Sequence, residues 1–439
     1  MLRGFQPSLG GVVKNSTTWL RRATRTPNRL EALFAPRCAI APYLFTGMLL
    51  AGIFIGLSQP AHASQIFSLV ADGNGIISEY AAQAGPALTM PESSESSFTP
   101  ASGPTPNLGA FTIVIVPGPG LAANAPALLA FQRAANQWQM RISDPITVTI
   151  NADLAPLGPG IIGSANSVTL QSNYTTIRNQ MVADAAPDVD DTIVASLPTA
   201  GGFSATLPAG FGTNGNLSAS KANLKAMGFT GLDVGFGVSD AAITFSSTFA
   251  FDYDNSNGVG PGLIDFETVA AHELGHALGF ISVVDTVDFL LNAGQTSSAI
   301  QPFPLDLFRF SSANNPANAA QFNTFPRNLT PGAAGFFDDT ANEYLFSTGQ
   351  FTGDGRQASH WKDNNLTGTL LGVMDPTLAT QQIFTITDAD WRAFDVIGYD
   401  IAPFATALII PEPSTLSLAS LMLLGTGVIG WRRKCRARS

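Results

Sequence analysis

The most informative stretch of the sequence is Ala271-His-Glu-Leu-Gly-His-Ala-Leu-Gly-Phe280. Its histidines, His272 and His276, are four residues apart, so on a helix they lie one turn apart on the same face. That spacing lets two imidazoles coordinate one zinc ion. Glu273, beside the first histidine, is placed to accept a proton from a zinc-activated water molecule. The stretch therefore predicts a metal-binding helix.

The residues on either side predict where this helix begins and ends. Asp265 is of a type that caps helix N-termini, and Thr268 lies three residues further on. Gly279 suits the helix exit, where a positive φ is wanted. We therefore expect the helix to run between Asp265 and Gly279.

The number of histidines favours metal binding over a chance match to a short motif. The chain has four histidines. His62 lies in a predicted signal peptide, which leaves His272, His276 and His360. Three is the number of protein ligands that a catalytic zinc site needs.

The body of the chain is acidic and lacks cysteine. Twelve of the 22 Lys and Arg residues lie in the terminal segments, whereas 30 of the 32 Asp and Glu residues lie in 64–410, which leaves that body at about −20. Such a charge argues against nucleic acid as a partner, since phosphates need Lys and Arg. Cys38 and Cys435 are both terminal, which excludes disulfides and cysteine catalysis from the body.

Hydrophobic patterns predict a domain that contains both strands and helices. We expect strands at 111–116, 146–150 and 241–251, and helices at 125–140, 175–185, 217–227 and 387–399. Charged residues make up only 12% of the chain, which is typical of a loop-rich extracellular domain.

The N-terminus predicts secretion. A basic lead is followed by an apolar run at 43–57 and by Ala61-His62-Ala63, which fits the small-x-small cleavage rule. Residues 1–63 are therefore predicted to be a signal peptide cleaved after Ala63. Residues 64–108 show little pattern and are interpreted as a linker or a propeptide.

The C-terminus predicts a membrane-associated tail at 411–439. Pro411-Glu412-Pro413 precedes an apolar run at 415–431 and Arg432-Arg433-Lys434, so the tail reads as a short span with a positive, cytoplasm-facing end. The order resembles the PEP-CTERM sorting tag of Gram-negative bacteria; a plain tail anchor is the alternative. The resemblance implies an exosortase-type enzyme that removes the tail, and export to the periplasm, cell surface or extracellular matrix.

The stretch His-Glu-Leu-Gly-His-Ala-Leu-Gly-Phe resembles the metzincin branch of zinc proteases, whose motif continues to a third His. Ser282 stands at that third position here. Downstream, Ser359-His360-Trp361 and Gly372-Val-Met374-Asp-Pro376 resemble the distal ligand segment and the Met-turn of leishmanolysin-like proteases. The resemblance implies His360 as the third zinc ligand and Met374 as an apolar floor beneath the ligands. Asp285 is the alternative ligand, because a carboxylate also binds zinc.

The resemblance also implies a fold and an activity. The fold is α+β: a metzincin-like zincin with a twisted mixed sheet and the active-site helix in an N-terminal catalytic subdomain at 109–280, and a mostly loop and strand C-terminal subdomain at 281–402 that ends in a helix. The activity is zinc-dependent cleavage of protein or peptide substrates with Glu273 as general base, and the strand at 241–251 would bind substrate from a sheet edge. The alternatives are a non-catalytic matrix or adhesion module and an amidase acting on cell-wall peptides.

Two acidic stretches stand apart from the predicted zinc site. Residues 252–258, Asp-Tyr-Asp-Asn-Ser-Asn-Gly, have oxygen ligands on alternate residues, so they form either a Ca²⁺ loop or a plain turn. The run Asp184, Asp188, Asp190 and Asp191 is expected to be a solvated surface.

Overall fold

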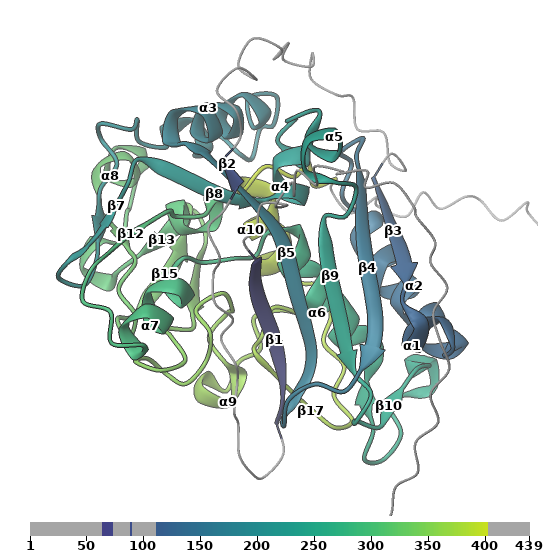
Figure 1. Ribbon diagram of the computed structural model, residues 1–439. Helices are drawn as coiled ribbons and strands as arrows, with labels where there is room; N and C mark the ends of the chain where they lie inside the picture. The colour runs from purple at the N-terminus through teal and green to yellow at the C-terminus, as the bar shows by residue number, and fades with distance from the viewer. Residues whose placement is uncertain (1–63, 73–87, 90–110, 403–439) are drawn as a thin grey trace, which may run out of the picture. The chain divides into compact units, whose positions relative to one another are not determined.

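The computed structural model describes the backbone of 64–72 and 88–89 and all atoms of 111–402 (Figure 1). The predicted signal peptide and the predicted tail lie outside the described residues. All the described residues belong to one unit, Gln59–Ser439. Within them, no helix is both long enough and apolar enough to cross a membrane.

The main element is an eight-stranded, twisted mixed sheet, as the α+β prediction requires. Six strands follow the order β17-β1-β5-β9-β4-β3. Their bounds are β1 Ser64–Asp72, β3 Thr112–Pro117, β4 Thr147–Ala155, β5 Ile161–Asn173, β9 Ala241–Ser246 and β17 Thr377–Ala379. Strands β3, β4 and β9 are parallel, and β5 is antiparallel to both β9 and β1. The remaining two strands, β2 (Leu88–Thr89) and β8 (Asn216–Ser220), pair with the second half of β5.

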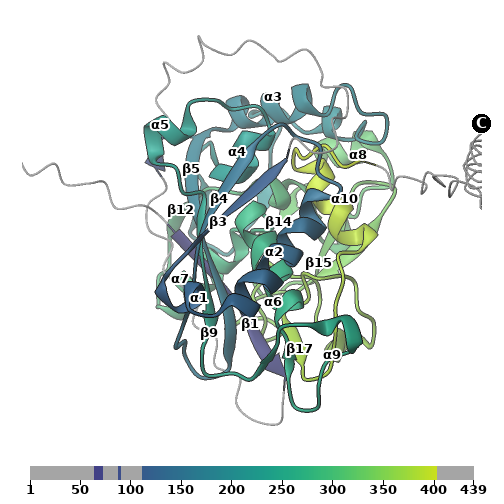
Figure 2. The same ribbon diagram turned by 90° about the vertical axis from the view of Figure 1, so that its right-hand side faces the viewer.

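Two long helices, α2 (Ala125–Gln139) and α6 (Phe266–Leu278), pack side by side behind this sheet (Figures 1 and 2). Helix α2 buries a face of small and aromatic residues that includes Ala127, Ala134 and Trp138. Small side chains let two helices approach closely, and the Trp138 indole donates a hydrogen bond of 3.0 Å to the Ala271 carbonyl. This packing fixes the position of the predicted metal-binding helix.

The C-terminal part of the domain, 281–402, forms short strands and helices, and most of them lie with β6 and β7 at one side of the sheet (Figure 1). The strands are β6 Ala205–Thr206, β7 Phe211–Thr213, β12 Ser298–Ile300, β13 Arg309–Phe310, β14 Arg327–Asn328, β15 Gly335–Asp338 and β16 Glu343–Phe346. The helices are α7 Val284–Asn292, α8 Ala319–Thr324, α9 Asn364–Thr367 and α10 Asp388–Val396. One hydrophobic core includes residues of both halves, for example Phe131 and Phe394.

Smaller elements complete the N-terminal part of the domain, 111–280. They are α1 Pro119–Ala122, α3 Tyr174–Asp184, α4 Lys221–Ala226, α5 Leu232–Phe236, β10 Phe251–Asp252 and β11 Ile264–Asp265. The predicted helix at 217–227 is wrong in its first part, because β8 occupies that part and pairs with β5; only α4 is helical. The first nine residues of the segment interpreted as a linker form β1.

The predicted edge strand at 241–251 is also wrong. It splits into β9 and β10, and β9 lies inside the sheet with β4 on one side and β5 on the other. A strand whose two sides are both paired has no backbone groups left for an added peptide. The sheet neighbour of β9, strand β5, went unpredicted, because its Gly163, Ser164 and Asn166 weaken the apolar pattern.

Candidate metal centre

Helix α6 carries the predicted motif and has the predicted ends. Asp265 caps its N-terminus by accepting a hydrogen bond of 2.9 Å from the Thr268 amide. Gly279 ends it with φ of 126°, where a side chain would be strained. Every residue of the helix is buried, so its polar side chains need partners or a ligand.

The structure brings His272, His276 and His360 together. Their Nε2 atoms lie 3.0–3.1 Å from one another, and all three side chains are completely buried. Two imidazoles come from α6 and the third from 84 residues further along the chain. In the part of the chain that the structure describes, this is the one group of His, Cys, Asp and Glu side chains arranged to hold a metal ion.

Each imidazole turns its other nitrogen to a backbone carbonyl. Nδ1 lies 2.7 Å from the Val373 oxygen in His272, 2.9 Å from the Phe280 oxygen in His276 and 3.2 Å from the Gln357 oxygen in His360. A carbonyl oxygen only accepts, so Nδ1 carries the proton and Nε2 presents a lone pair. The three lone pairs converge with no proton between them.

This donor set fits a zinc ion. Burial lowers the pKa of His272 to about 4 and lowers the pKa of His276 and of His360 well below the usual value, so all three rings are neutral. Neutral acceptors at such separations repel one another unless a cation lies among them. Tetrahedral zinc with Zn–N bonds of about 2.0–2.1 Å has nitrogens roughly 3.3–3.4 Å apart, close to the separations here.

His360 lies in a loop that other segments hold in place. Asp285, on α7, accepts hydrogen bonds from the amides of Ala358 and Ser359 and from the Ser359 hydroxyl. Arg309 is fully buried and donates to the Ala358 oxygen at 3.2 Å and to the Ser347 oxygen at 2.6 Å. All of these contacts except that of the Ser359 hydroxyl use backbone groups of the loop, so they fix the path of the chain.

The alternative ligand Asp285 and the residue at the third motif position, Ser282, are engaged elsewhere. Both carboxylate oxygens of Asp285 accept hydrogen bonds from the loop that carries His360, so Asp285 holds that loop. Ser282 donates at 2.6 Å to Asp306, a fully buried carboxylate, and its amide donates to Ser359. Burial raises the pKa of Asp285 to about 7, against the effect of its hydrogen bonds.

Met374 lies against the helix between its two histidines. A Cβ on Gly275 would come within 2.3 Å of the Met374 sulfur, so only glycine allows this contact. The adjoining backbone is held by Asp390, which accepts 2.8 Å hydrogen bonds from the Val373 amide and from the Trp361 indole. Asp390 thereby connects Val373, whose carbonyl orients His272, to Trp361, which follows His360 in the sequence.

Glu273 is completely buried next to His272, and its carboxylate lies against strand β5. A Cβ on Gly163 would approach the Glu273 Oε1 to within 2.5 Å. Glycine at this position of β5 is therefore what leaves room for the carboxylate.

The predicted calcium loop has the contacts of a turn. Asp252 accepts hydrogen bonds from the amides of Asp254 and Gly260, and Asn255 donates to Asp265 at 3.1 Å. Both carboxylate oxygens of Asp252 therefore already accept hydrogen bonds from the protein. The calcium interpretation stays a prediction.

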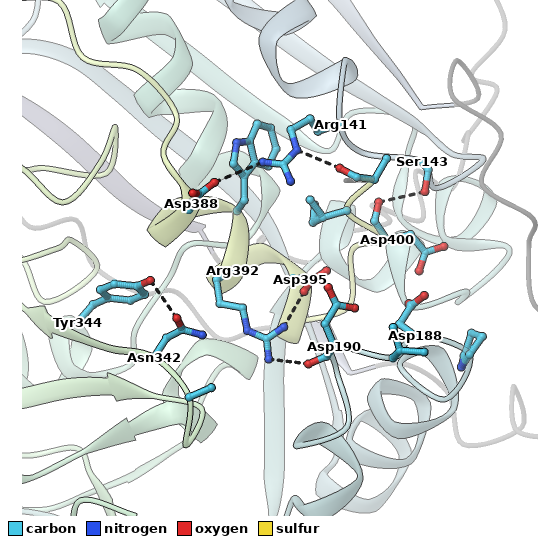
Figure 3. Close-up of a pocket in the computed structure, with 16 residues that line it drawn as sticks. Arg141, Ser143, Asp188, Asp190, Asn342, Tyr344, Asp388, Arg392, Asp395 and Asp400 are labelled. Carbon is cyan, nitrogen blue, oxygen red and sulfur yellow. Dashed lines mark hydrogen bonds and ion pairs between the residues drawn. The ribbon is translucent and has the colours of Figure 1, made fainter. Parts of the chain in front are cut away.

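The acidic run is only partly a solvated surface. Asp190 is exposed, but Asp191 is buried and pairs with Arg392 at 2.7 Å. Figure 3 shows Arg392 directed toward Asp190 and Asp395 in a cavity of about 830 Å³. The expectation is wrong for Asp191, because a distant arginine on α10 compensates its charge. No histidine of the metal centre lines this cavity.

Sequence reasoning missed three residues that shape the centre: Gly163, Arg309 and Asp390. Asp390 had a local signal, since it stands three residues after Thr387 in a capping box. Gly163 and Arg309 act through neighbours far away in the sequence, and no local pattern marks them.

Comparison with known proteins identifies the C-terminus. The family model described as the PEP-CTERM protein-sorting motif matches residues 410–434, which confirms that prediction. No curated protein and no solved structure matches the chain. The protein therefore carries the sorting motif of exported proteins of Gram-negative bacteria, which an exosortase-type enzyme recognises.

Proposed function

We propose that the protein is an exported zinc-dependent endopeptidase. The observation that carries the proposal is the convergence of three buried imidazole Nε2 atoms, together with the buried Glu273, which follows His272 on helix α6. Three nitrogen ligands leave a tetrahedral ion one open position, as catalytic zinc requires. A purely structural zinc site has four protein ligands and needs no adjacent carboxylate.

The mechanism assigns one role to each group. His272, His276 and His360 hold the metal, and a bound zinc ion supplies the Lewis acid that polarises a peptide carbonyl and acidifies water. Glu273 accepts the proton of the attacking water and returns it to the leaving amine. Gly163 sets where the Glu273 carboxylate can lie, and the carbonyls of Val373, Phe280 and Gln357 keep Nε2 unprotonated.

The test measures zinc content and casein hydrolysis of the exported chain, before and after the residues ahead of β3 are trimmed. We expect Glu273→Gln to retain zinc and to lose about 10²–10⁴-fold in rate, as general bases typically contribute. Gly163→Ala should also retain zinc while slowing hydrolysis, because it displaces Glu273. Gly212→Ala is the matched control, a strand glycine whose added Cβ would meet no atom within 4 Å.

Other results would select the alternatives. Stoichiometric zinc with hydrolysis of cell-wall peptides but not of casein would support an amidase. Stoichiometric zinc with no hydrolysis of either substrate, in the whole or the trimmed chain, would support a non-catalytic matrix or adhesion module.

A further inference from the structure

Strand β1 fills a slot between two strands that border the metal centre. It runs antiparallel to β5 from Ser64 to Val70 and parallel to β17 from Val70 to Asp72. Figure 1 shows it as the dark strand beside β5, with β17 near its lower end. Without β1, β5 and β17 would each present an unpaired edge.

One border of the slot touches the candidate centre, and the other follows Met374 closely in the sequence. Leu69 of β1 pairs with Gly163, the residue against which Glu273 packs. Val70 pairs with Thr377, three residues after Met374. The register of β1 shifts between these same two residues, so an irregularity of the strand lies where it passes the glutamate.

The reactive groups are enclosed. Glu273 and the three histidines have no exposed surface, and α6 lies against β1 as well as β5. A peptide cannot reach a zinc ion on these imidazoles unless something moves. Strand β1 is the segment to move, because it covers the edge of β5 at Gly163, the residue against which Glu273 lies.

An extended peptide has the chemistry that the slot accepts. Pairing on both sides uses backbone amides and carbonyls, so it takes many sequences. A segment of the same chain has an effective concentration in the millimolar range, which lets it exclude peptides added from solution. Signal cleavage at the predicted position, after Ala63, would make β1 the first nine residues of the exported chain.

We propose that Ser64–Asp72 is an inhibitory strand that occupies the peptide-binding slot between β5 and β17. The proposal rests on the proposed function for its role, but the occupancy of the slot is a separate and measurable property. Displacement of β1 opens the edges of β5 and β17 beside Glu273 and admits an extended substrate.

The experiment weakens β1 in the full exported chain through its backbone. Phe67→Pro with Ser68→Pro removes two successive amides, one of which faces β5 whatever the register, because successive amides point to opposite sides. Phe67→Ala with Ser68→Ala is the matched control that keeps both amides. A second form carries a specific cleavage site after Ser96 and is cut after folding, so the test does not depend on how the proline variant folds.

Three readouts are compared, two of them independent of activity. For the proline variant and the cut form we expect faster hydrogen exchange in 161–168 of β5 with unchanged exchange in β4, and transfer of zinc to a chelator at least ~10-fold faster. Casein hydrolysis should rise by a similar factor. Excess synthetic peptide of sequence 64–72 should reverse all three changes, and the alanine control should resemble the wild type.

The outcomes separate this inference from the proposed function. Unchanged exchange in 161–168, or unchanged zinc transfer once β5 is exposed, would overturn the inhibitory strand even if casein is cleaved. Faster zinc transfer that the peptide reverses, without hydrolysis in any form, would support β1 as the occupant of the slot and refute the endopeptidase.

Discussion

Helix α6 and the loop around His360 supply imidazoles to the same candidate centre in different ways. In α6, the helix repeat itself sets the separation of His272 and His276, and the caps lie within the same stretch of chain. His360 has neither helix nor strand around it, and its position depends on Asp285, Arg309 and Asp390. Two of the three histidines are therefore placed by a local sequence motif and the third by the folding of the 84 residues after His276.

The largest expected effect comes from removing one ligand of each kind. His276→Ala and His360→Ala should each lower zinc affinity by on the order of 10³-fold, since each removes about a third of a binding free energy of ten or more kcal/mol. Zinc titration against a competing chelator measures this loss of affinity. If His360→Ala retains zinc and His276→Ala does not, then His360 is not a ligand and Asp285 becomes the third ligand.

A smaller effect should come from the support of the loop. Asp285→Asn replaces an acceptor of three hydrogen bonds, so we expect a 10–100-fold loss of zinc affinity. Asp288→Asn is the matched control, one turn along α7, because Asp288 binds the amides of Phe351 and Thr352 instead. Both variants should lose about 1–3 kcal/mol of unfolding free energy, measured in urea, but only Asp285→Asn should lose zinc affinity. Equal losses of zinc affinity would show that the loop is not held locally.

A test of the helix side is Gly275→Ala. The new Cβ would meet the Met374 sulfur, so we expect a loss of about 1–3 kcal/mol in unfolding free energy and less than a tenfold loss of zinc affinity. The double variant Gly275→Ala with Met374→Ala should lose less stability than the sum of the two single variants, since they share one contact. Additive losses would mean that Met374 does not rest on the helix.

The smallest effect on zinc affinity is expected from a change at Asp184, which belongs to neither α6 nor the His360 loop. Burial raises the pKa of Asp184 to about 9, so between about pH 4 and pH 9 the folded protein keeps a proton that the unfolded chain has lost. The free energy of unfolding should therefore fall as the pH rises through this interval. Asp184→Asn should flatten that dependence and stabilise the protein at pH 8 by at least about 1 kcal/mol, with zinc affinity unchanged. An unaltered pH dependence in thermal melts would contradict the assignment.

The same difference between local motifs and distant contacts explains how much of the fold and of the candidate site could be predicted from the sequence. The ends of α6, the strand at 112–117 and the helix at 125–139 follow from caps and periodicity. The sequence singled out His360 by counting histidines and by a resemblance, but not the means by which it is held. Strand β5 and the place of β9 inside the sheet could not be predicted, because strand order is set by partners distant in sequence.

The separation between His276 and His360 has a consequence for the stability of the domain. A zinc ion held by both closes a loop of 84 residues in a body that has no cysteine. A covalent link closing a loop of that size would remove unfolded-chain entropy equivalent to about 4.6 kcal/mol. A zinc ion in this position would therefore act as a cross-link of the domain, and we expect chelation to make α7 and β12–β16 more sensitive to proteases.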